Sequence, residues 1–378
     1  MEKNISFMKN KILFLLPLLF TTIGCSNNES TPTGEDKTII DTQGREVTYN
    51  TGKLNRVICI GAGALRYYSY IGDINKIVAV EEIDSKNTFG VGQALRPYYQ
   101  ANVDYFSSLP LCGKGGPMAQ VADVEAIVRN NPDIIISFLS SEANNDLESN
   151  IDVPVIGLSQ GKDGIFDDKT LSSLKLLSTI FNRNERYESI KNLVETAKND
   201  FKDLTLTEDS YYVGCIGNWG KTNLLGSFNE FPVFKYAKVK NALSDLDVEI
   251  SGQQVSIESE ALVKINPDHI FVDTSGLNEF INAYKLDSTI YDSLKAFEDG
   301  ETYQLLPYNA YYTNLEIQLM STYYVAQIAH EEFEYLNLEE KMNEITNVFL
   351  NKEMYNEMKS HQYGFGGYRA FDIKEYIS

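Results

Sequence analysis

The 378-residue sequence has few histidines and cysteines, and far fewer basic residues than acidic ones. Its three histidines and four cysteines leave little material for a Cys/His metal site, which typically needs four such ligands. Its 33 lysines and arginines are outnumbered by 53 aspartates and glutamates, which gives a net charge of -20. Because an acidic surface repels polyanions, we expect no nucleic-acid partner.

Motifs for metal-dependent hydrolysis and nucleotide phosphate binding are also missing. No His-Glu-x-x-His or Walker pattern occurs. Gly61 and Gly63, with Glu81 after the next apolar run, imitate a dinucleotide-binding fingerprint, but Arg66 replaces its third glycine. We therefore expect no enzymatic activity and no cofactor, and keep a cell-surface α/β enzyme as the alternative.

The beginning of the chain is typical of a bacterial export signal. Three lysines, the last of them Lys11, precede a mainly apolar stretch from Ile12 to Ile23. This stretch is shorter than the roughly 20 residues that span a bilayer, but it suits the core of a signal peptide. Gly24 and Cys25 follow directly and resemble a lipobox, in which Cys25 is lipidated and becomes the new N-terminus. A secreted protein with an incidental cysteine is the alternative.

Removal of residues 1–24 changes how the rest is interpreted. The processed chain loses three lysines and one glutamate, so its net charge becomes -22. Residues 25–37 are polar without a hydrophobic period and predict a flexible tether. We expect an extracytoplasmic protein, anchored to the membrane by its lipid. Cys59 and Cys215 lie in apolar runs and are interpreted as buried thiols rather than a disulfide framework.

An internal repeat is the most informative feature of the sequence. Residues 125–136 (EAIVRNNPDIII) and 260–271 (EALVKINPDHIF) share Asn-Pro-Asp and most apolar positions. In both copies a short amphipathic helix ends where proline prevents its continuation, and the apolar run that follows predicts a buried strand. A weaker match pairs residues 56–61 with 212–217, both ending in Cys-Ile-Gly. Together they predict an α/β fold of two lobes with parallel sheets and the same element order.

The segment between the two repeats predicts the link between the lobes. Its apolar periodicity and lack of proline favour one long helix over residues 169–203, with a break near Asn182 as the alternative. This helix separates an N-terminal lobe (38–168) from a C-terminal lobe with a helical tail (204–378). The predicted tail elements are a strand over 302–306 and helices over 314–330 and 339–359.

In this order, the features resemble the helical-backbone class (class III) of ABC-importer solute-binding proteins. The resemblance rests on the lipobox, the run DTQGREV over 41–47, the strand RVICIG over 56–61, the two Glu/Asn-Pro-Asp copies and the linking helix. It covers about residues 38–360. It implies two Rossmann-like lobes joined by one long helix, a ligand cleft between them and little hinge motion.

The resemblance also implies the partners. This family takes up ferric siderophores, haem and cobalamin, and includes molybdate and tungstate binders. We expect an iron chelate of the ferric-siderophore type, with haem, cobalamin or a molybdate or tungstate oxyanion as alternatives. The expected partners are therefore a small anionic ligand, an ABC permease and the membrane, and the protein is expected to be a monomer.

Candidate ligand contacts follow from the position of the predicted strands. Ligands of open parallel sheets bind beyond the carboxyl ends of the strands, so the loops after Gly61 and Gly217 should face the cleft. In an acidic protein, basic side chains there would attract an anionic ligand, and aromatic rings would stack on it. The candidate ligand-binding residues are Arg66, Tyr67, Arg96, Tyr98, Trp219, Lys221, Tyr311 and Tyr312.

Each candidate has a structural alternative. Arg66 lies near a predicted helix N-terminus, which favours anions, but it could pair with Glu81 or Glu82 instead. Arg96 could be a solvated surface residue, and Trp219 could anchor its own loop. The adjacent tyrosines near the C-terminal strand could belong to the core.

Glu125 and Glu260 occupy the same place in the two repeats. The resemblance implies that they dock onto arginines of the membrane permease. The alternative is that both are first-turn glutamates favoured by the helix dipole. Asp123 and Glu258 are the second choice for docking.

Overall fold

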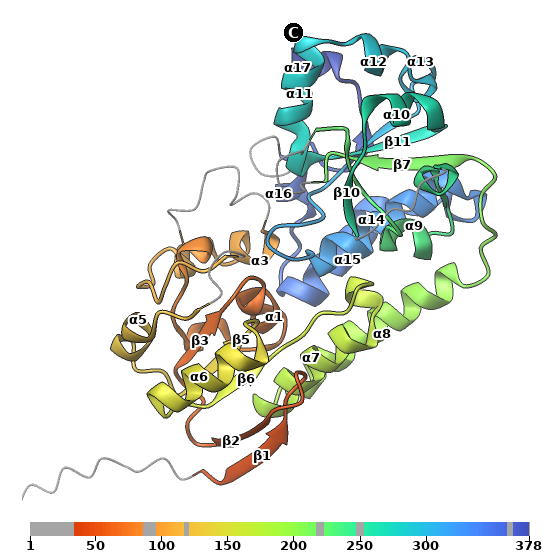
Figure 1. The fold of residues 1–378 in the computed structure, drawn as a ribbon. Coiled ribbons are helices and arrows are strands. Elements are labelled where there is room, and N and C mark those ends of the chain that lie inside the picture. Colours follow the sequence, from red (N-terminus) through yellow and green to blue (C-terminus); the bar gives the residue numbers. More distant parts are fainter. Residues whose placement is uncertain are drawn as a thin grey trace, which may run out of the picture. The chain divides into compact units, whose positions relative to one another are not determined.

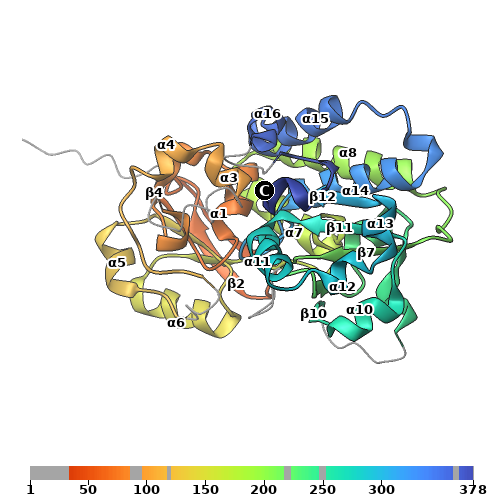
Figure 2. The ribbon, with the colours of Figure 1, turned by 90° about the horizontal axis from the view of Figure 1, so that it is seen from above.

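Two mainly parallel sheets organise the chain in the computed structural model, each within its own lobe (Figures 1 and 2). The structure describes residues 34–85, 96–116, 121–216, 223–246, 253–360 and 366–377. The predicted α/β class with two parallel-sheet lobes is confirmed. None of the described helices is long and apolar enough to cross a bilayer.

The first lobe is built on a four-stranded parallel sheet of order β4-β3-β5-β6. Its strands are β3 (Val57–Ile60), β4 (Ile77–Ala79), β5 (Ile134–Ser137) and β6 (Val155–Gly157). Its helices are α1 (Ala64–Ile71), α3 (Pro97–Gln100), α4 (Val103–Phe106), α5 (Val124–Arg129) and α6 (Ser141–Ile151). A separate antiparallel hairpin precedes the sheet and consists of β1 (Asp36–Ile40) and β2 (Glu46–Asn50).

The second lobe contains a five-stranded sheet of order β13-β12-β11-β7-β9, in which only β13 is antiparallel. Its strands are β7 (Ser210–Gly214), β9 (Lys240–Asn241), β11 (His269–Asp273), β12 (Thr302–Leu305) and β13 (Arg369–Ala370). A further antiparallel pair consists of β8 (Gly226–Phe228) and β10 (Gln254–Ser256). The helices are α9 (Pro232–Tyr236), α10 (Ser259–Ile265), α11 (Leu277–Leu286), α12 (Thr289–Asp292), α13 (Lys295–Asp299), α14 (Leu315–Ala329), α15 (Leu338–Leu350), α16 (Tyr355–Lys359) and α17 (Lys374–Ile377).

The Asn-Pro-Asp repeat has the same backbone structure in both lobes. After α5 and α10, Asn131 and Asn266 adopt the left-handed conformation, with φ of 44° and 38°. Asparagine tolerates this region better than most side chains, and the proline that follows prevents further helix. The chain then enters β5 or β11, which pairs in parallel with β3 or β7. The predicted αβ unit is therefore present twice.

The aspartate of each repeat fastens the start of the neighbouring strand. Asp133 Oδ2 accepts hydrogen bonds from the backbone N–H groups of Asn55 and Arg56, just before β3 (2.9 and 3.0 Å). Asp268 Oδ2 accepts one from the N–H of Ser210, the first residue of β7 (2.9 Å). A strand start otherwise leaves such groups to water, so the repeat motif both ends a helix and sets the strand register.

The weaker Cys-Ile-Gly match is displaced by two residues from the structural repeat. Val57 is opposite Ile134, and Tyr211 is opposite His269, the repeat equivalent of Ile134. The structural equivalent of Val57 is therefore Tyr211, whereas the sequence match pairs it with Val213. Side chains alternate with a period of two along a strand, so this displacement leaves the pattern of buried faces unchanged.

The link between the lobes consists of two helices, α7 (Asp168–Ile180) and α8 (Asn184–Phe201), rather than one. The break lies at Asn182, whose φ is 52°. The two helices pack against each other, α7 also packs on α1 of the first lobe, and α8 packs on α15 (Figure 1). The structure thus has two linking helices, which was the alternative prediction, instead of one continuous helix.

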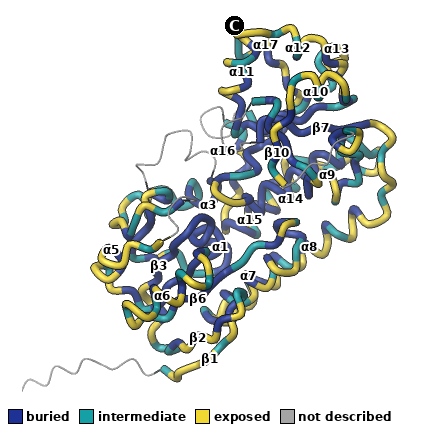
Figure 3. Tube along the Cα trace, viewed as in Figure 1, coloured by how far each residue is buried: buried dark blue, intermediate teal, exposed yellow. Residues whose placement is uncertain are grey.

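The cores lie around the sheets, which Figure 3 shows as largely buried. In the tail, α14 is buried along most of its length, and the second predicted helix is divided into α15 and α16. Cys59, Cys112 and Cys215 are free and buried, which confirms the interpretation of Cys59 and Cys215 as buried thiols.

Candidate functional site

The turn between β3 and α1 brings the first lobe close to a loop of the second. Gly61 and Gly63 have φ of 80° and 90°, which residues with a Cβ rarely adopt. A Cβ atom on Gly63 would lie 3.1 Å from the ring of Tyr312. Glycine thus allows the segment 306–314, which we call the aromatic loop, to approach the start of α1.

Arg66 on α1 is completely buried at this contact. Its Nη2 donates a 2.6 Å hydrogen bond to the carbonyl oxygen of Ala310 in the aromatic loop. Its Nε and Nη1 have no hydrogen-bond partner among the described residues. The guanidinium also lies 5.0 Å from the centre of the Tyr98 ring. A buried, permanently charged group with two free nitrogens is costly, so it is suited to accept an anion.

A buried carboxyl group from the second lobe lies near Arg66, against the next turn of α1. Glu316 on α14 accepts a hydrogen bond from the hydroxyl of Tyr70, and its Oε1 has no partner within the described chain. Burial raises the pKa of Glu316, while the bond from Tyr70 and the charge of Arg66 act in the opposite direction. This contact was not predicted, although a glutamate in the apolar run of α14 was a visible signal.

Arg96 and Tyr98 belong to one buried cluster with Asp84. Arg96 Nη1 lies 3.1 Å from Asp84 Oδ1, and the hydroxyl of Tyr98 donates to the same oxygen at 2.5 Å. The guanidinium of Arg96 also lies over the ring of Tyr99, at 4.8 Å. The structure thus places Arg96 in the interior. There Asp84 orients both Arg96 and Tyr98, and the ring of Tyr98 lies against Arg66. Asp84 was not among the predicted residues.

Tyr67 and Tyr312 are joined through Phe138 and a polar bridge. The ring of Phe138 lies 4.8 Å from that of Tyr67 and 5.3 Å from that of Tyr312. Tyr67 donates to Gln160 Oε1 at 3.1 Å, and Gln160 Nε2 donates to Thr313 Oγ1 at 3.2 Å. Tyr67 is buried, while Tyr312 and the adjacent Tyr311 are partly exposed. The structure therefore gathers these predicted residues around the aromatic loop.

Asp273, at the end of β11, forms a hydrogen bond to the backbone of the aromatic loop. Its carboxylate accepts hydrogen bonds from the N–H groups of Tyr308 and Ser275, both at 2.8 Å. Burial raises the pKa of Asp273 to about 7, although these bonds favour the ionised form. In the first lobe, Glu81 accepts a bond from the N–H of Gly61 at 2.9 Å, and burial raises its pKa to about 8.

The remaining predicted site residues lie elsewhere. Trp219 and Lys221, proposed to contact the ligand, and the lipidation candidate Cys25 lie outside the described residues. The docking candidates Glu125 and Glu260 are exposed in the first turns of α5 and α10.

The second-choice docking residues are less equivalent than their sequence positions suggest. Asp123 caps α5 by accepting a 3.0 Å bond from the N–H of Ala126, so its carboxylate already has a structural role. Glu258 occupies the corresponding position before α10, but makes no side-chain cap bond there.

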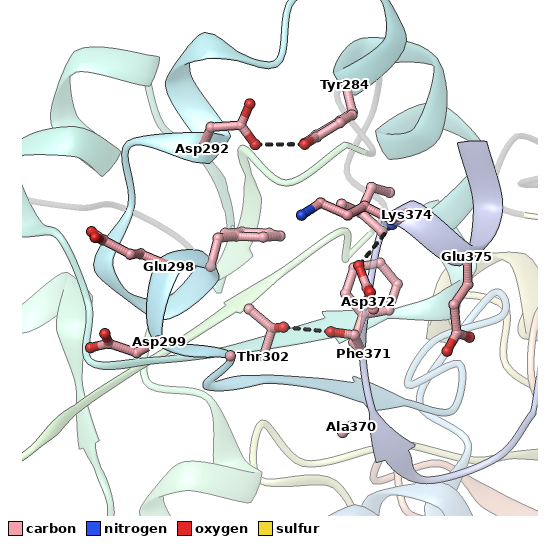
Figure 4. Close-up of a pocket in the computed structure, with 13 residues that line it drawn as sticks. Tyr284, Asp292, Glu298, Asp299, Thr302, Ala370, Phe371, Asp372, Lys374 and Glu375 are labelled. Atoms are coloured by element: carbon pink, nitrogen blue, oxygen red, sulfur yellow. Dashed lines mark hydrogen bonds between the residues drawn. The ribbon is translucent and has the colours of Figure 1, made fainter. Parts of the chain in front are cut away.

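A pocket of about 770 Å³ lies in the second lobe near Thr302, at the amino end of β12 (Figure 4). Ligands of parallel sheets bind at the opposite, carboxyl edge, and no predicted ligand residue lines this pocket. Two of its lining residues are bonded to each other: Tyr284 donates to Asp292 at 2.5 Å, and a dashed line marks this bond in Figure 4. An anionic ligand is disfavoured here by the acidic lining. The acidic lining residues are Asp292, Glu298, Asp299, Asp372 and Glu375.

Catalytic and metal-binding arrangements find little support in the described residues. Gly157–Gly161 (GLSQG) matches the Gly-x-Ser-x-Gly pattern of hydrolase nucleophiles, but Ser159 Oγ donates to the carbonyl of Thr42 at 3.3 Å. The two described histidines are bonded elsewhere, His269 to Glu301 and His330 to a backbone carbonyl. No group of three or more His, Cys, Asp or Glu side chains in the described ranges is placed to hold a metal ion.

Comparison with known proteins relates the fold to a family of binding proteins. Residues 57–307 match the family model described as periplasmic binding protein. A periplasmic solute binding protein from Veillonella parvula has 14% identity and a TM-score of 0.66, over 85% of this chain and 95% of that one. The Haemophilus influenzae molybdate periplasmic binding protein MolA has 16% identity and a TM-score of 0.62, over 84% and 99%.

A third similar structure is the periplasmic catecholate-siderophore binding protein VctP from Vibrio cholerae. It has 19% identity and a TM-score of 0.50, over 78% of this chain and 99% of that one. At these identities the structural likeness shows the fold alone. A comparison with curated protein sequences gave no match.

Proposed function

Because the chain belongs to the periplasmic binding protein family, we propose that it is the lipid-anchored, extracytoplasmic solute-binding protein of an ABC importer. Its proposed task is to capture a ferric siderophore and deliver it to the membrane permease, without a catalytic step. Haem, cobalamin and a molybdate or tungstate oxyanion are the alternative ligands. Similar folds belong to proteins named for binding molybdate and a catecholate siderophore, both anionic ligands, which supports a ligand of this charge.

The observation that carries the proposal is the incomplete bonding of Arg66. Two of its three guanidinium nitrogens lack a partner among the described residues, although the side chain is fully buried. A protein interior rarely leaves such donors unbonded. An anionic oxygen of the ligand would satisfy them and would offset the buried positive charge. Tyr98, whose ring already lies against Arg66, would then form part of the same wall.

Entry of this ligand requires the aromatic loop to move. The carbonyl of Ala310 occupies one nitrogen of Arg66, and the ring of Tyr312 covers Gly63. The partly exposed Tyr311 and Tyr312 lie on the same loop, so a shift would expose both the cation and the rings that we propose as contacts. Trp219 and Lys221 remain proposed contacts from the sequence, and Arg96 contributes through its cluster with Asp84.

A thermal-shift screen tests the ligand class. The processed protein is heated with ferric siderophores, haemin, cobalamin, molybdate or tungstate. A ligand present at 100 times its Kd stabilises the fold by about 2.7 kcal/mol, which raises Tm by several degrees. No shift with any of these compounds would contradict the proposal. Hydrolytic or redox turnover that is lost when one proposed contact is substituted would favour an enzyme instead.

Arg66→Ala distinguishes a specific site from general stabilisation. It should weaken binding of the ligand found in the screen about 100-fold or more, because a charge-assisted bond to a buried anion is lost. Lys175→Ala is the matched control, since Lys175 is an exposed cation on α7 far in sequence from the site. Isothermal titration of both variants measures the difference. Equal affinities would exclude Arg66 as a ligand contact.

The lipid anchor is tested separately at Cys25. We expect the wild-type protein to sediment with membranes and to carry a diacylglyceryl mass on Cys25. Cys25→Ser should release it into the soluble extracytoplasmic fraction with its ligand affinity unchanged. A soluble wild-type protein would contradict the anchor without affecting the proposed ligand.

A further inference from the structure

Exposed apolar side chains gather around α5, beside the proposed docking residue Glu125. Of the eleven large hydrophobic residues exposed in the described ranges, four lie here. Their exposed fractions are 41% for Leu111, 81% for Val121, 36% for Val124 and 54% for Val128. We call these four residues the α5 patch. Figure 3 shows α5 as a largely exposed helix.

Local structure does not account for the α5 patch. Ala126 and Ile127 already supply the buried contacts of this short helix. Val124 and Val128 are one turn apart and share a face, but β-branched residues are weaker helix formers than the alanine, lysine or glutamate usual at exposed positions. Leu111 lies near the end of the same helix, because its carbonyl accepts a bond from Asn130 at 3.3 Å. Exposed apolar residues that gather around one short helix in this way often mark an interaction surface.

The repeat provides an internal comparison for these positions. Residues of α5 and α10 correspond with a constant offset of 135, which pairs Glu125 with Glu260 and Val128 with Val263. At the places of Val121 and Val124 the second lobe has serines instead. These two residues are Ser256 and Ser259. In the part of the chain that the structure describes, both candidate docking ends thus have an exposed glutamate and an exposed valine, but the exposed Val121 and Val124 have no apolar counterpart at the equivalent positions of the second lobe.

We propose that the α5 patch is an apolar anchor for the membrane permease, so that the first lobe docks through apolar contact and charge while the second docks mainly through charge. This inference rests on the proposed function. The patch lies beside Glu125, whose 3.1 Å pair with Arg129 is exposed and therefore weak enough to exchange for a basic residue of a partner. The fitting partner surface has an apolar ridge beside a basic side chain.

The chemistry of the surroundings favours a protein partner over a lipid surface. Acidic residues flank the patch, among them Asp123 and Glu125, and the whole chain has a net charge of -20. Anionic lipid head groups would be repelled by these charges. A basic protein surface would be attracted, and its apolar part would remove the valines from water.

The test exchanges the residues of the two lobes. Val121→Ser/Val124→Ser gives the start of α5 and the segment before it the serines found at the equivalent positions of the second lobe, and Ser256→Val/Ser259→Val does the reverse. Kd is measured for the processed protein and the importer's permease in phosphatidylcholine nanodiscs, from 50 to 500 mM KCl. We expect the first variant to bind about 10-fold more weakly or worse, by the same factor at every salt concentration. The comparison variant Glu125→Gln should lose less at high salt, because charge pairs are screened.

Controls separate this inference from the proposed function. Tm and ligand affinity of the serine variant should equal those of the wild type, and the exposed Leu286→Ser on α11 should leave permease binding unchanged. An unchanged Kd for the serine variant, with normal wild-type binding, would overturn the inference alone. Binding of the wild type to empty nanodiscs would assign the patch to a lipid surface. Wild-type dimers that the serine variant does not form would assign it to a second copy of the chain. Either result would also overturn the inference. Absence of any wild-type permease binding would overturn the proposed function as well.

Discussion

The two lobes place the same Asn-Pro-Asp turn in different surroundings. In the first lobe, Asp133 receives two backbone N–H groups. In the second, Asp268 receives the N–H and the hydroxyl of Ser210 and also pairs with Lys295 at 2.7 Å. The backbone turn is thus the part that the fold requires twice. The two lobes differ in the residues around this turn, both at the strand starts and on the exposed faces of α5 and α10.

Charge reversal on the two docking helices should have the largest effect. We expect Glu125→Arg/Glu260→Arg to abolish ligand uptake by cells, because both ends would then repel the basic residues of the permease. Each single reversal should leave some uptake, and Glu125→Arg should leave more than Glu260→Arg, since the α5 patch still holds the first lobe. Uptake of radiolabelled ligand measures this ranking.

The double reversal must leave ligand affinity and Tm intact to be interpreted as a docking defect. Both glutamates are exposed, so the fold should tolerate the change. A fall in ligand affinity would assign them a structural role. Equal uptake by the two single variants would remove the proposed difference between the lobes.

Removal of the repeat aspartates should cost stability unequally. We expect Asp268→Ala to lower the free energy of unfolding by about 2–3 kcal/mol and Asp133→Ala by about 1–2 kcal/mol, since Asp268 makes more bonds. Burial alone would raise the pKa of Asp268, but the bonds from Lys295 and Ser210 outweigh it and lower the pKa to about 2. The contribution of Asp268 is therefore present above its unfolded pKa and is lost only as pH falls toward 2.

Urea denaturation at pH 7 measures both losses, with Asp299→Ala as the control on an exposed aspartate at the end of α13 in the same lobe. The matched Asp→Asn variants keep one acceptor oxygen and should lose less. Equal losses for Asp133→Ala and Asp268→Ala would mean that the additional bonds of the second lobe contribute nothing.

The repeat made much of the fold predictable. Local signals such as Asn-Pro-Asp fix the end of a helix and the start of a strand within a few residues, so the αβ units and the strand at 302–306 were expected. The break at Asn182 was visible only as an alternative, because asparagine is tolerated inside helices as well as at their ends. The displaced match at Cys215 shows the limit of such reasoning, since a period of two cannot distinguish registers two residues apart.

The candidate site was less predictable, because its contacts join distant parts of the chain. Arg66 was identified from its place after a strand, but its partner Ala310 is 244 residues away and contributes only a carbonyl. No side-chain type signals that bond. Tyr70 and Glu316 are likewise far apart in the sequence, so their pairing could not be predicted. A carboxylate within an apolar helix nevertheless indicated a buried polar contact.

Buried acids at the carboxyl edges of both sheets predict a loss of stability as pH rises toward 8. Burial raises the pKa of Glu81 to about 8 in the first lobe and that of Asp273 to about 7 in the second. Raised values mean that their contribution is present below the unfolded pKa and is lost as pH rises through 7 to 8. We expect Tm to fall by a few degrees between pH 6 and pH 8, as the last part of a decline that begins near the unfolded pKa, with no further fall from these two groups above pH 8.

The two acids should be separable by substitution. Asp273→Asn should flatten the fall below pH 7 only, whereas Glu81→Gln should also remove the part that continues from pH 7 to pH 8, because each amide keeps an acceptor but does not ionise. Differential scanning calorimetry across this range measures both curves. A wild-type Tm that rises over the same interval would contradict the assignment for both lobes.

The smallest expected effects come from the left-handed asparagines. In Asn131→Ala and Asn266→Ala the strain of a Cβ at positive φ, without a local polar partner, should cost about 1 kcal/mol, and Asn266→Ala also loses a hydrogen bond. Glycine removes this strain, so Asn131→Gly should be nearly neutral. Asn266→Gly should still cost about 1 kcal/mol, because Asn266 Oδ1 accepts a 2.9 Å bond from the N–H of Lys295. If denaturation showed equal stability for the two glycine variants, that bond would contribute nothing, and the two turns would be energetically as well as geometrically equivalent.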